Sequence, residues 1–410
     1  MFKNKILVTI FCTVFIDLIG IGILIPVIPQ LFANPLSPEF LLPAGTSLNT
    51  GFMMLGLLVA LYPIGQFLAT PILGQLSDRY GRKKVLALSL FGTAISYVLF
   101  AIGIITKNIP LLFFSRFFDG LTGGNISVAQ AMISDVSKPE NRMKNFGMLG
   151  AAFGLGFIFG PYIGGKLSDP SVVSWFSASV PFFFAAILAF LNMLSVWFLL
   201  KETNTNLKTE KITWNKSISN IKRAMKIPGL NAIFLTNFLF FGGFTFFTTF
   251  FSVYLINKFG FTQGNIGDFF AYIGIWSAFT QAVVTRQISK RYQNKQDTII
   301  KYTLIGAAVF ILAYFLPRVS WQLLFIPPFF SLCTGLIMAN LNALLSKMAP
   351  ANSQGEMMGI SASVQALAQS IPALLSGFIA ASLAPTTPLF VAAFFVFLSA
   401  FAFHKLYKKA

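Results

Sequence analysis

The chain has 410 residues, of which 56% are hydrophobic and only 10% are charged, and its formal net charge at neutral pH is +18. This leaves too little polar surface for a soluble globule, so the composition indicates a polytopic membrane protein. Its two cysteines lie in apolar segments and its single histidine lies near the C-terminus, which argues against disulfides, a metal centre or a histidine-dependent enzyme. We expect no enzyme activity, no metal, no cofactor and no binding to nucleic acid.

Twelve mostly apolar segments are each long enough to cross a bilayer core of about 30 Å as a helix. The alternating pattern of a β-barrel strand is absent from runs such as residues 6–29. This apolar run is also too long for a signal peptide, so it is expected to be the first spanning helix. The predicted fold class is an all-α membrane protein with transmembrane helices near residues 6–31, 51–75, 85–106, 110–134, 146–168, 178–200, 230–256, 266–288, 299–317, 320–345, 356–384 and 386–404.

Basic residues are concentrated on one side of these segments. Most Lys and Arg residues fall at the two termini, in residues 201–229 and in the even-numbered loops. Short loops that face the cytoplasm retain Lys and Arg, and these also attract anionic lipid headgroups. We therefore expect a multi-pass protein of the cytoplasmic (inner) membrane with both termini in the cytoplasm.

An internal repeat organises the chain. A shift of 212 residues, from Arg79 to Arg291, aligns two separated blocks of identical residue types, including Leu111 with Leu323. Parallel repeats of this kind place a substrate site near the middle of the bilayer, between halves that move against each other. The expected domains are an N-terminal six-helix bundle (1–200), a cytoplasmic linker (201–229) and a C-terminal six-helix bundle (230–410).

Three stretches carry a family resemblance. GQLSDRYGRKKVL, residues 74–86, resembles the signature loop G-x-L-x-D-R-x-G-R-K-x-x-L of the major facilitator superfamily. DLIGIGILIPVIP, residues 17–29, and GAAFGLGFIFGPYIGG, residues 150–165, are similar to stretches of its twelve-helix drug/proton antiporters, most closely the tetracycline exporters. The C-terminal half matches mainly in architecture. The resemblance implies a proton-coupled secondary transporter that exports a small amphipathic molecule or drug.

The signature loop is predicted to hold a cytoplasmic gate. Its glycines allow backbones to approach closely, its carboxylate can face the N-terminal end of a helix from the other half, and its arginines can bridge carboxylates or carbonyls. The resemblance implies that the cluster keeps the gate shut, whereas the positive-inside rule alone would leave the carboxylate and glycines unexplained. The gate candidates are Gly74, Asp78, Arg79, Gly81 and Arg82.

Glycines of the fifth predicted helix are spaced mostly by four, so they share one face. Such a face lets a neighbouring helix pack closely. The resemblance adds that exporters working by antiport carry this stretch, although a packing face alone would explain it. Its members are Gly150, Gly154, Gly156, Gly160, Pro161 and Gly164.

Three charged residues lie well inside predicted helices: Asp17, Arg116 and Asp119. Intramembrane charges are costly and usually serve a function or have a partner. Arg116 and Asp119 are three residues apart and can form an ion pair, which leaves Asp17 without an obvious countercharge. All three are proton-coupling candidates, and Asp119 departs from the family pattern, so either acid could carry the proton. The alternatives are a permanent ion pair and, for Asp17, a helix-packing hydrogen bond near Gly20.

Polar and aromatic side chains of the seventh, tenth and eleventh helices could line an apolar cavity. Packing against lipid or other helices is the simpler explanation for any single one, above all for the many Phe residues of the seventh helix. The candidates are Asn237, Phe241, Thr245, Asn340, Gln365 and Gln369.

The sequence thus predicts a monomeric, proton-coupled antiporter whose partners are the lipid bilayer and a small-molecule substrate. Two acids and one arginine favour a cationic or zwitterionic amphipathic substrate, or a metal-chelated one. A proton-coupled importer of a nutrient and a transporter of a siderophore or other metabolite remain alternatives, because one fold supports both directions and many cargoes.

Overall fold

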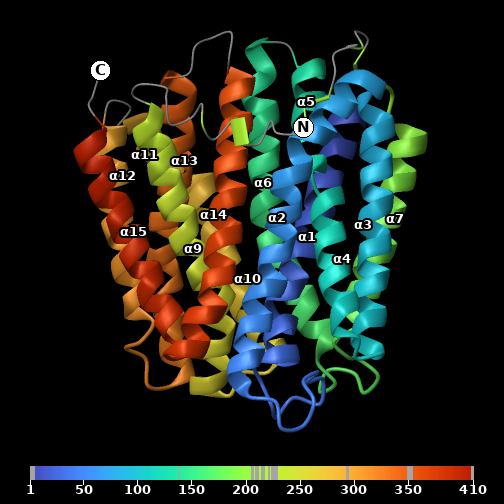
Figure 1. Ribbon diagram of the computed structural model, residues 1–410. Coiled ribbons are helices and arrows are strands. Elements are labelled where there is room, and N and C mark those ends of the chain that lie inside the picture. The colour runs from blue at the N-terminus through green and yellow to red at the C-terminus, as the bar shows by residue number, and fades with distance from the viewer. Residues whose placement is uncertain are drawn as a thin grey trace. The chain divides into compact units, whose positions relative to one another are not determined.

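The computed structural model describes residues 5–137, 139–204, 207, 212–213, 218–219, 222, 230–291, 295–348 and 354–407. Every regular element in this part of the chain is a helix, as predicted. Nine helices among the described residues are long and apolar enough to span a membrane. The elements (Figure 1) are α1 (Lys5–Phe32), α2 (Leu48–Tyr80), α3 (Arg82–Ile105), α4 (Ile109–Thr122), α5 (Asn125–Val136), α6 (Pro139–Ser168), α7 (Val180–Leu199), α9 (Leu230–Phe259), α10 (Gln263–Phe279), a π-helical turn (Thr280–Val284), α11 (Thr285–Arg291), α12 (Gln296–Ala313), a 3-10 turn (Ser320–Phe325), α13 (Pro327–Met348), α14 (Gln354–Ser382) and α15 (Thr387–Leu406).

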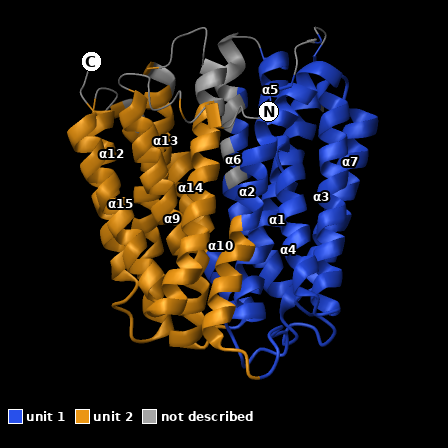
Figure 2. Cartoon of the chain, viewed as in Figure 1, with its two compact units in different colours: residues 1–44, 61–217, 262–271 blue, residues 45–60, 218–261, 272–410 orange. Residues whose placement is uncertain are grey.

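The chain forms two compact units (Figure 2). Unit 1 comprises residues 1–44, 61–217 and 262–271, and unit 2 comprises residues 45–60, 218–261 and 272–410. Helices α2 and α10 each contribute to both units, because the first turns of α2 belong to unit 2 and those of α10 to unit 1. The division into bundles 1–200 and 230–410 with linker 201–229 stays a prediction, and most of residues 205–229 lie outside the described part.

Unit 1 is built on close contact between α1 and α6. A Cβ atom added to Gly160 would lie 2.8 Å from the Cα atom of Gly22, and one added to Gly164 would lie 2.6 Å from the carbonyl oxygen of Ile23. Only glycine permits this spacing, which maximises van der Waals contact where apolar lipid offers no hydrophobic driving force. The close approach therefore holds α1, and with it the candidate residue Asp17, at a fixed position against α6.

The predicted fourth span, 110–134, is divided into α4 and α5 by a break at Gly123 and Gly124. A Cβ atom at Gly123 would lie 2.6 Å from the Tyr62 hydroxyl oxygen, so the break packs tightly on α2. Gln66 donates a hydrogen bond from Nε2 to the Gly123 carbonyl at 3.2 Å. A helix can break at membrane depth where a neighbour satisfies the freed backbone group in this way. The break makes Asn125 the first residue of α5.

The many Phe residues of α9 form the core of unit 2. Phe246, Phe247, Phe250 and Phe251 are each at most 1% exposed. The rings of Phe247 and Phe251 stack with centroids 4.4 Å apart, and both contact the ring of Tyr314. These residues pack against neighbouring helices, which is the simpler of the two interpretations offered for this helix.

Candidate functional site

The signature loop of unit 1 joins α2 to α3 through a single residue, Gly81. Its φ angle is +97°, a conformation that residues with a Cβ atom rarely adopt. A Cβ atom there would also lie 2.5 Å from the Glu202 Oε2 atom. The glycine therefore sets the sharp turn at which α3 begins and leaves room for a carboxylate at the start of that helix.

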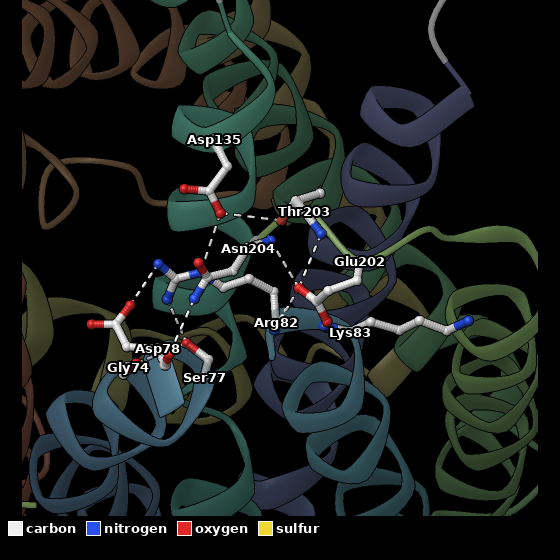
Figure 3. A network of polar contacts seen from close by, with 9 residues as sticks. All are labelled: Gly74, Ser77, Asp78, Arg82, Lys83, Asp135, Glu202, Thr203 and Asn204. Carbon is white, nitrogen blue, oxygen red and sulfur yellow. Dashed lines mark hydrogen bonds and ion pairs between the residues drawn. The ribbon is translucent and has the colours of Figure 1, made fainter. Parts of the chain in front are cut away.

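Arg82 is the centre of a polar network that joins the end of α2 to the end of α5 (Figure 3). Its guanidinium lies 2.6 Å from Asp78 Oδ1 through Nη2 and 3.3 Å from Asp135 Oδ2 through Nε. Its Nη1 donates to the Ser77 hydroxyl at 2.6 Å. The Arg82 side chain is only 11% exposed, so these ion pairs are less screened than pairs on an open surface.

Glu202, three residues after the end of α7, places its carboxylate at the N-terminus of α3 (Figure 3). Oε1 accepts hydrogen bonds from the backbone N–H groups of Arg82 at 2.9 Å and of Thr203 and Asn204 at 3.0 Å. Oε2 accepts one from the N–H group of Lys83 at 3.1 Å. An anion at this position satisfies helix donors that lack an intrahelical partner and faces the positive end of the helix dipole.

The residues after Glu202 extend the same network. The Asn204 amide donates to the Asp78 carbonyl and the Thr203 hydroxyl to Asp135 Oδ2, both at 3.1 Å. Further along, Gln75 exchanges two hydrogen bonds with the backbone of Thr213. The start of the predicted linker is thus attached to the signature loop.

The predicted gate residues take different places. Asp78, Gly81 and Arg82 belong to the network. The Asp78 carboxylate forms an ion pair with Arg82 of the same unit. Arg79 is exposed, with its guanidinium 5.4 Å from the centre of the Tyr80 ring, and a Cβ atom added to Gly74 would meet nothing within 4 Å. Their role in a gate stays a prediction.

Asp17 is buried on α1 and is 5% exposed. Its Oδ1 atom accepts a hydrogen bond from the Asn125 amide at 2.9 Å. Its Oδ2 atom is buried without a hydrogen-bond partner among the described residues. One oxygen of the carboxyl group is thus held and the other is left for a proton, a water molecule or a substrate group.

Arg116 and Asp119 form the ion pair expected from their spacing. Arg116 Nη1 lies 2.6 Å from Asp119 Oδ2, and the two side chains are 7% and 2% exposed. The guanidinium also lies over the Tyr62 ring, 4.8 Å from its centre, while Nε is buried without a partner among the described residues. The positive charge of Arg116 balances the negative charge of Asp119. Asp17 is the second acid of the cluster, and Arg116 is not paired with it.

Two tyrosines complete this intramembrane cluster. Tyr62 on α2 and Tyr97 on α3 both interact electrostatically with Asp17, Asp119 and Arg116. The hydroxyl of Tyr97 lies where a Cβ atom of Gly20 would be, one turn along α1 from Asp17. Together with Asn125, side chains of five helices, α1 to α5, therefore meet at the acids.

The glycine face of α6 is directed mainly at α1. Gly156, Gly160 and Gly164 pack on it, and Pro161 contacts Gly22. A Cβ atom at Gly154 would meet nothing within 4 Å. Gly150 lies on α6, but its surroundings are outside the described part.

Two of the cavity candidates of unit 2, Asn340 and Thr245, form hydrogen bonds within their own helices. The Asn340 amide donates to the Leu336 carbonyl at 2.8 Å, and the Thr245 hydroxyl donates to the Phe241 carbonyl at 2.8 Å. Asn237 is buried. Gln365 and Gln369 are half-buried on α14. A substrate role for these six residues stays a prediction.

An apolar hollow of unit 1 lies beside the helix break. A Cβ atom at Gly124 would lie 2.7 Å from Leu73, one of its lining side chains. Gly124 directly precedes Asn125 in the chain, so the hollow offers apolar contact close to that residue. The hollow is lined by Leu68, Ala69, Ile72, Leu73 and Leu121.

Beyond the other end of α6, Asp169 binds the start of α10. Its carboxylate accepts hydrogen bonds from the backbone and hydroxyl of Ser171 at 2.9 and 2.7 Å, from the Thr262 hydroxyl at 2.9 Å and from the Gly264 N–H group at 3.1 Å. Burial raises the pKa of Asp169, but the hydrogen bonds outweigh it, so the pKa lies below its usual value.

The sequence did not single out Asn125, Tyr62, Asp135 or Glu202. Asn125 could have been found as a polar residue inside an apolar segment, and Glu202 as the acid that follows the sixth apolar segment directly. Tyr62 and Asp135 carried no such signal, because an aromatic ring in a membrane helix and an acid at its end are both common.

Comparison with known proteins adds independent findings. Residues 10–373 match the family described as Major Facilitator Superfamily. The chain is 31% identical over 387 residues to the tetracycline resistance protein, class H, of Pasteurella multocida, covering 92% of this chain and 89% of that protein. It is 26% identical over 379 residues to multidrug resistance protein 2 of Bacillus subtilis (strain 168), covering 92% and 88%. The crystal structure of a human organic anion transporter superposes with a TM-score of 0.74 at 21% identity, covering 98% of this chain and 100% of that one. The predicted resemblance and fold class are confirmed.

Proposed function

This chain belongs to the Major Facilitator Superfamily and is a membrane transporter, and on that premise we propose that it is a proton-coupled antiporter that exports small amphipathic cations or zwitterions. Its relatives are named for resistance to tetracycline and to multiple drugs, which supports drugs of this kind as the cargo. We propose that it acts as a monomer in the cytoplasmic membrane. Both termini face the cytoplasm in this proposal, because the basic residues are concentrated on that side.

The observation that carries this proposal is the buried carboxyl group of Asp17 with one unpartnered oxygen. A charge inside the membrane costs about 3 kcal/mol or more at the helix centre, so such an acid is neutralised either by a proton or by a cation. Binding of a cationic substrate and binding of a proton therefore exclude each other at Asp17. Mutual exclusion at one site is what an antiporter requires.

The neighbouring pair supports an export cycle. Because Arg116 and Asp119 already balance each other, Asp17 sets the net charge of the cluster. A proton that arrives from the outer side would displace the substrate there, and its release to the cytoplasm would allow the next substrate to bind. The apolar hollow beside Gly124 offers contact for the apolar part of such a molecule.

The Arg82 network is proposed as the cytoplasmic gate of unit 1. Asp78, Arg82, Asp135 and Glu202 tie together the ends of α2, α5 and α7 and the start of α3. Because the same network includes the residues after α7, a movement of the linker would strain it directly.

Reconstituted protein would test the function. Liposomes that contain a pH-sensitive dye are given a proton gradient, and cationic drugs, tetracyclines, siderophores, sugars and amino acids are added in turn. We expect proton movement that depends on a cationic or zwitterionic drug and is lost in Asp17→Asn, while Asp119→Asn reports whether the second acid contributes. Unchanged, pH-dependent transport in both variants would refute the role of the acids. Transport without proton movement would refute the coupling.

A further inference from the structure

Asn125 is a polar side chain in direct contact with the acid that we assign to proton coupling. It is 1% exposed, and its Nδ2 atom donates to Asp17 Oδ1 at 2.9 Å. We propose that Asn125 is a positioning residue for Asp17: it holds one carboxyl oxygen in both charge states and leaves the other as the atom that exchanges the proton for the substrate. This inference rests on the proposed antiport function.

The chemistry of the amide explains why it suits this role. The Nδ2 group of asparagine can only donate, and an ionised carboxylate can only accept. When Asp17 takes a proton on the unheld Oδ2 atom, Oδ1 is still an acceptor, so the hydrogen bond to Asn125 persists. The carboxyl group therefore keeps one orientation through the cycle and needs no reorganisation when its charge changes.

The helix break brings this amide to α1. Gly123 and Gly124 end α4, and Gln66 from α2 satisfies the Gly123 carbonyl. As the first residue of α5, Asn125 contacts Asp17, which is 108 residues away in the chain. The two glycines, together with the half-buried Gln66 that satisfies the freed carbonyl, give the break a structural cause.

The other charged and titratable groups near Asp17 do not replace this contact. Asp119 on α4 acts on it electrostatically, and Arg116 is engaged by Asp119 at 2.6 Å. Tyr62 on α2 and Tyr97 on α3 also interact electrostatically with Asp17. From α6, Gly156, Gly160, Pro161 and Phe159 contact α1 near Asp17, and none of these four residues is charged or titratable.

A second buried amide in unit 1 provides a matched control. Asn192 on α7 is 3% exposed, and its Oδ1 atom accepts a hydrogen bond from the Thr13 hydroxyl at 3.1 Å, one turn before Asp17 on α1. Both amides therefore fix α1 from a neighbouring helix, but only Asn125 touches the acid. A merely structural effect should appear equally in Asn125→Ala and Asn192→Ala.

The test measures the pH of half-maximal drug-dependent proton movement in proteoliposomes. The Asn125 amide binds the ionised carboxylate more strongly than the protonated carboxyl group, so its removal disfavours the ionised form of Asp17. We therefore expect the midpoint of Asn125→Ala to move toward alkaline pH by about one unit. The nearly isosteric Asn125→Asp keeps the packing, adds a second acid and should move it in the same direction. Asn192→Ala should leave it unchanged.

A second readout needs no drug. A hydrophobic carbodiimide reacts with protonated carboxyl groups, so the extent of labelling at Asp17 against pH, located by mass spectrometry, should shift with the midpoint. If wild-type protein couples drug to proton and Asp17→Asn does not, but both Asn125 variants keep the wild-type midpoint and labelling profile, this inference is overturned alone. Absence of coupling in wild-type protein would instead overturn the proposed function.

Discussion

Glu202 offers the sharpest test of how the signature loop is held. Its carboxylate accepts four backbone hydrogen bonds, two of which come from Arg82 and Lys83 at the start of α3. Loss of a helix cap typically costs about 0.5 to 2 kcal/mol. Because the Glu202 side chain is exposed and partly screened, we expect Glu202→Ala to lie near the middle of this range, at about 1 kcal/mol.

Hydrogen exchange measured by mass spectrometry can detect that loss locally. A cost of about 1 kcal/mol corresponds to about fivefold faster exchange of the backbone N–H groups that open with the start of α3. Glu39→Ala is the control, since the Glu39 carboxylate accepts only one described backbone hydrogen bond, from Ala178 at 3.2 Å. Equal exchange near residues 82–83 in wild-type, Glu39→Ala and Glu202→Ala protein would refute the capping role.

Two further predictions concern α6 and its end. Gly160→Ala places a Cβ atom 2.8 Å from Gly22 Cα, so it should lower the free energy of unfolding, measured by thermal unfolding, by about 1 to 3 kcal/mol. Gly154→Ala is the control and should be tolerated, because a Cβ atom there meets nothing within 4 Å. Equal effects of the two substitutions would contradict the packing of α1 on α6. Because the pKa of Asp169 is lower in the folded state, its contribution to stability is present at neutral pH and is lost as pH falls through that pKa. Asp169→Asn should therefore lower the unfolding temperature at pH 7 and converge with wild-type protein at low pH, and a constant difference across pH would contradict this.

The sequence predicted the helical fold well because membrane spans have a strong local signal. Twenty apolar residues in a row leave few alternatives to a helix. The break between α4 and α5 was not predicted from Gly123 and Gly124, because glycine is also frequent in continuous membrane helices. Its cause is the contact with Tyr62 and Gln66 on α2, which depends on packing between helices that are distant in sequence.

The candidate site was predicted unevenly for the same reason. Asp17, Arg116 and Asp119 stood out because charges inside the membrane are rare, and the ion pair of the last two follows from their spacing. Partners that come from other helices, such as Asn125 for Asp17 and Asp135 for Arg82, need the tertiary structure. The expectation that Asp78 faces a helix end from the other half stays a prediction beside its observed pairing with Arg82.

Helix α5 joins the two polar clusters of unit 1. Asn125 at its start contacts Asp17, and Asp135 near its end contacts Arg82, ten positions and about 15 Å further along the helix. A helix this short moves as a rigid body about the glycine break, so we expect a change of charge at Asp17 to reach the Arg82 network through α5. This link is a hypothesis from the chain of contacts that α5 makes. It predicts that hydrogen exchange at residues 82–83 responds to drug binding in wild-type protein and not in Asp17→Asn. If exchange responds equally in both proteins, the drug signal reaches the loop by a path that does not begin at Asp17.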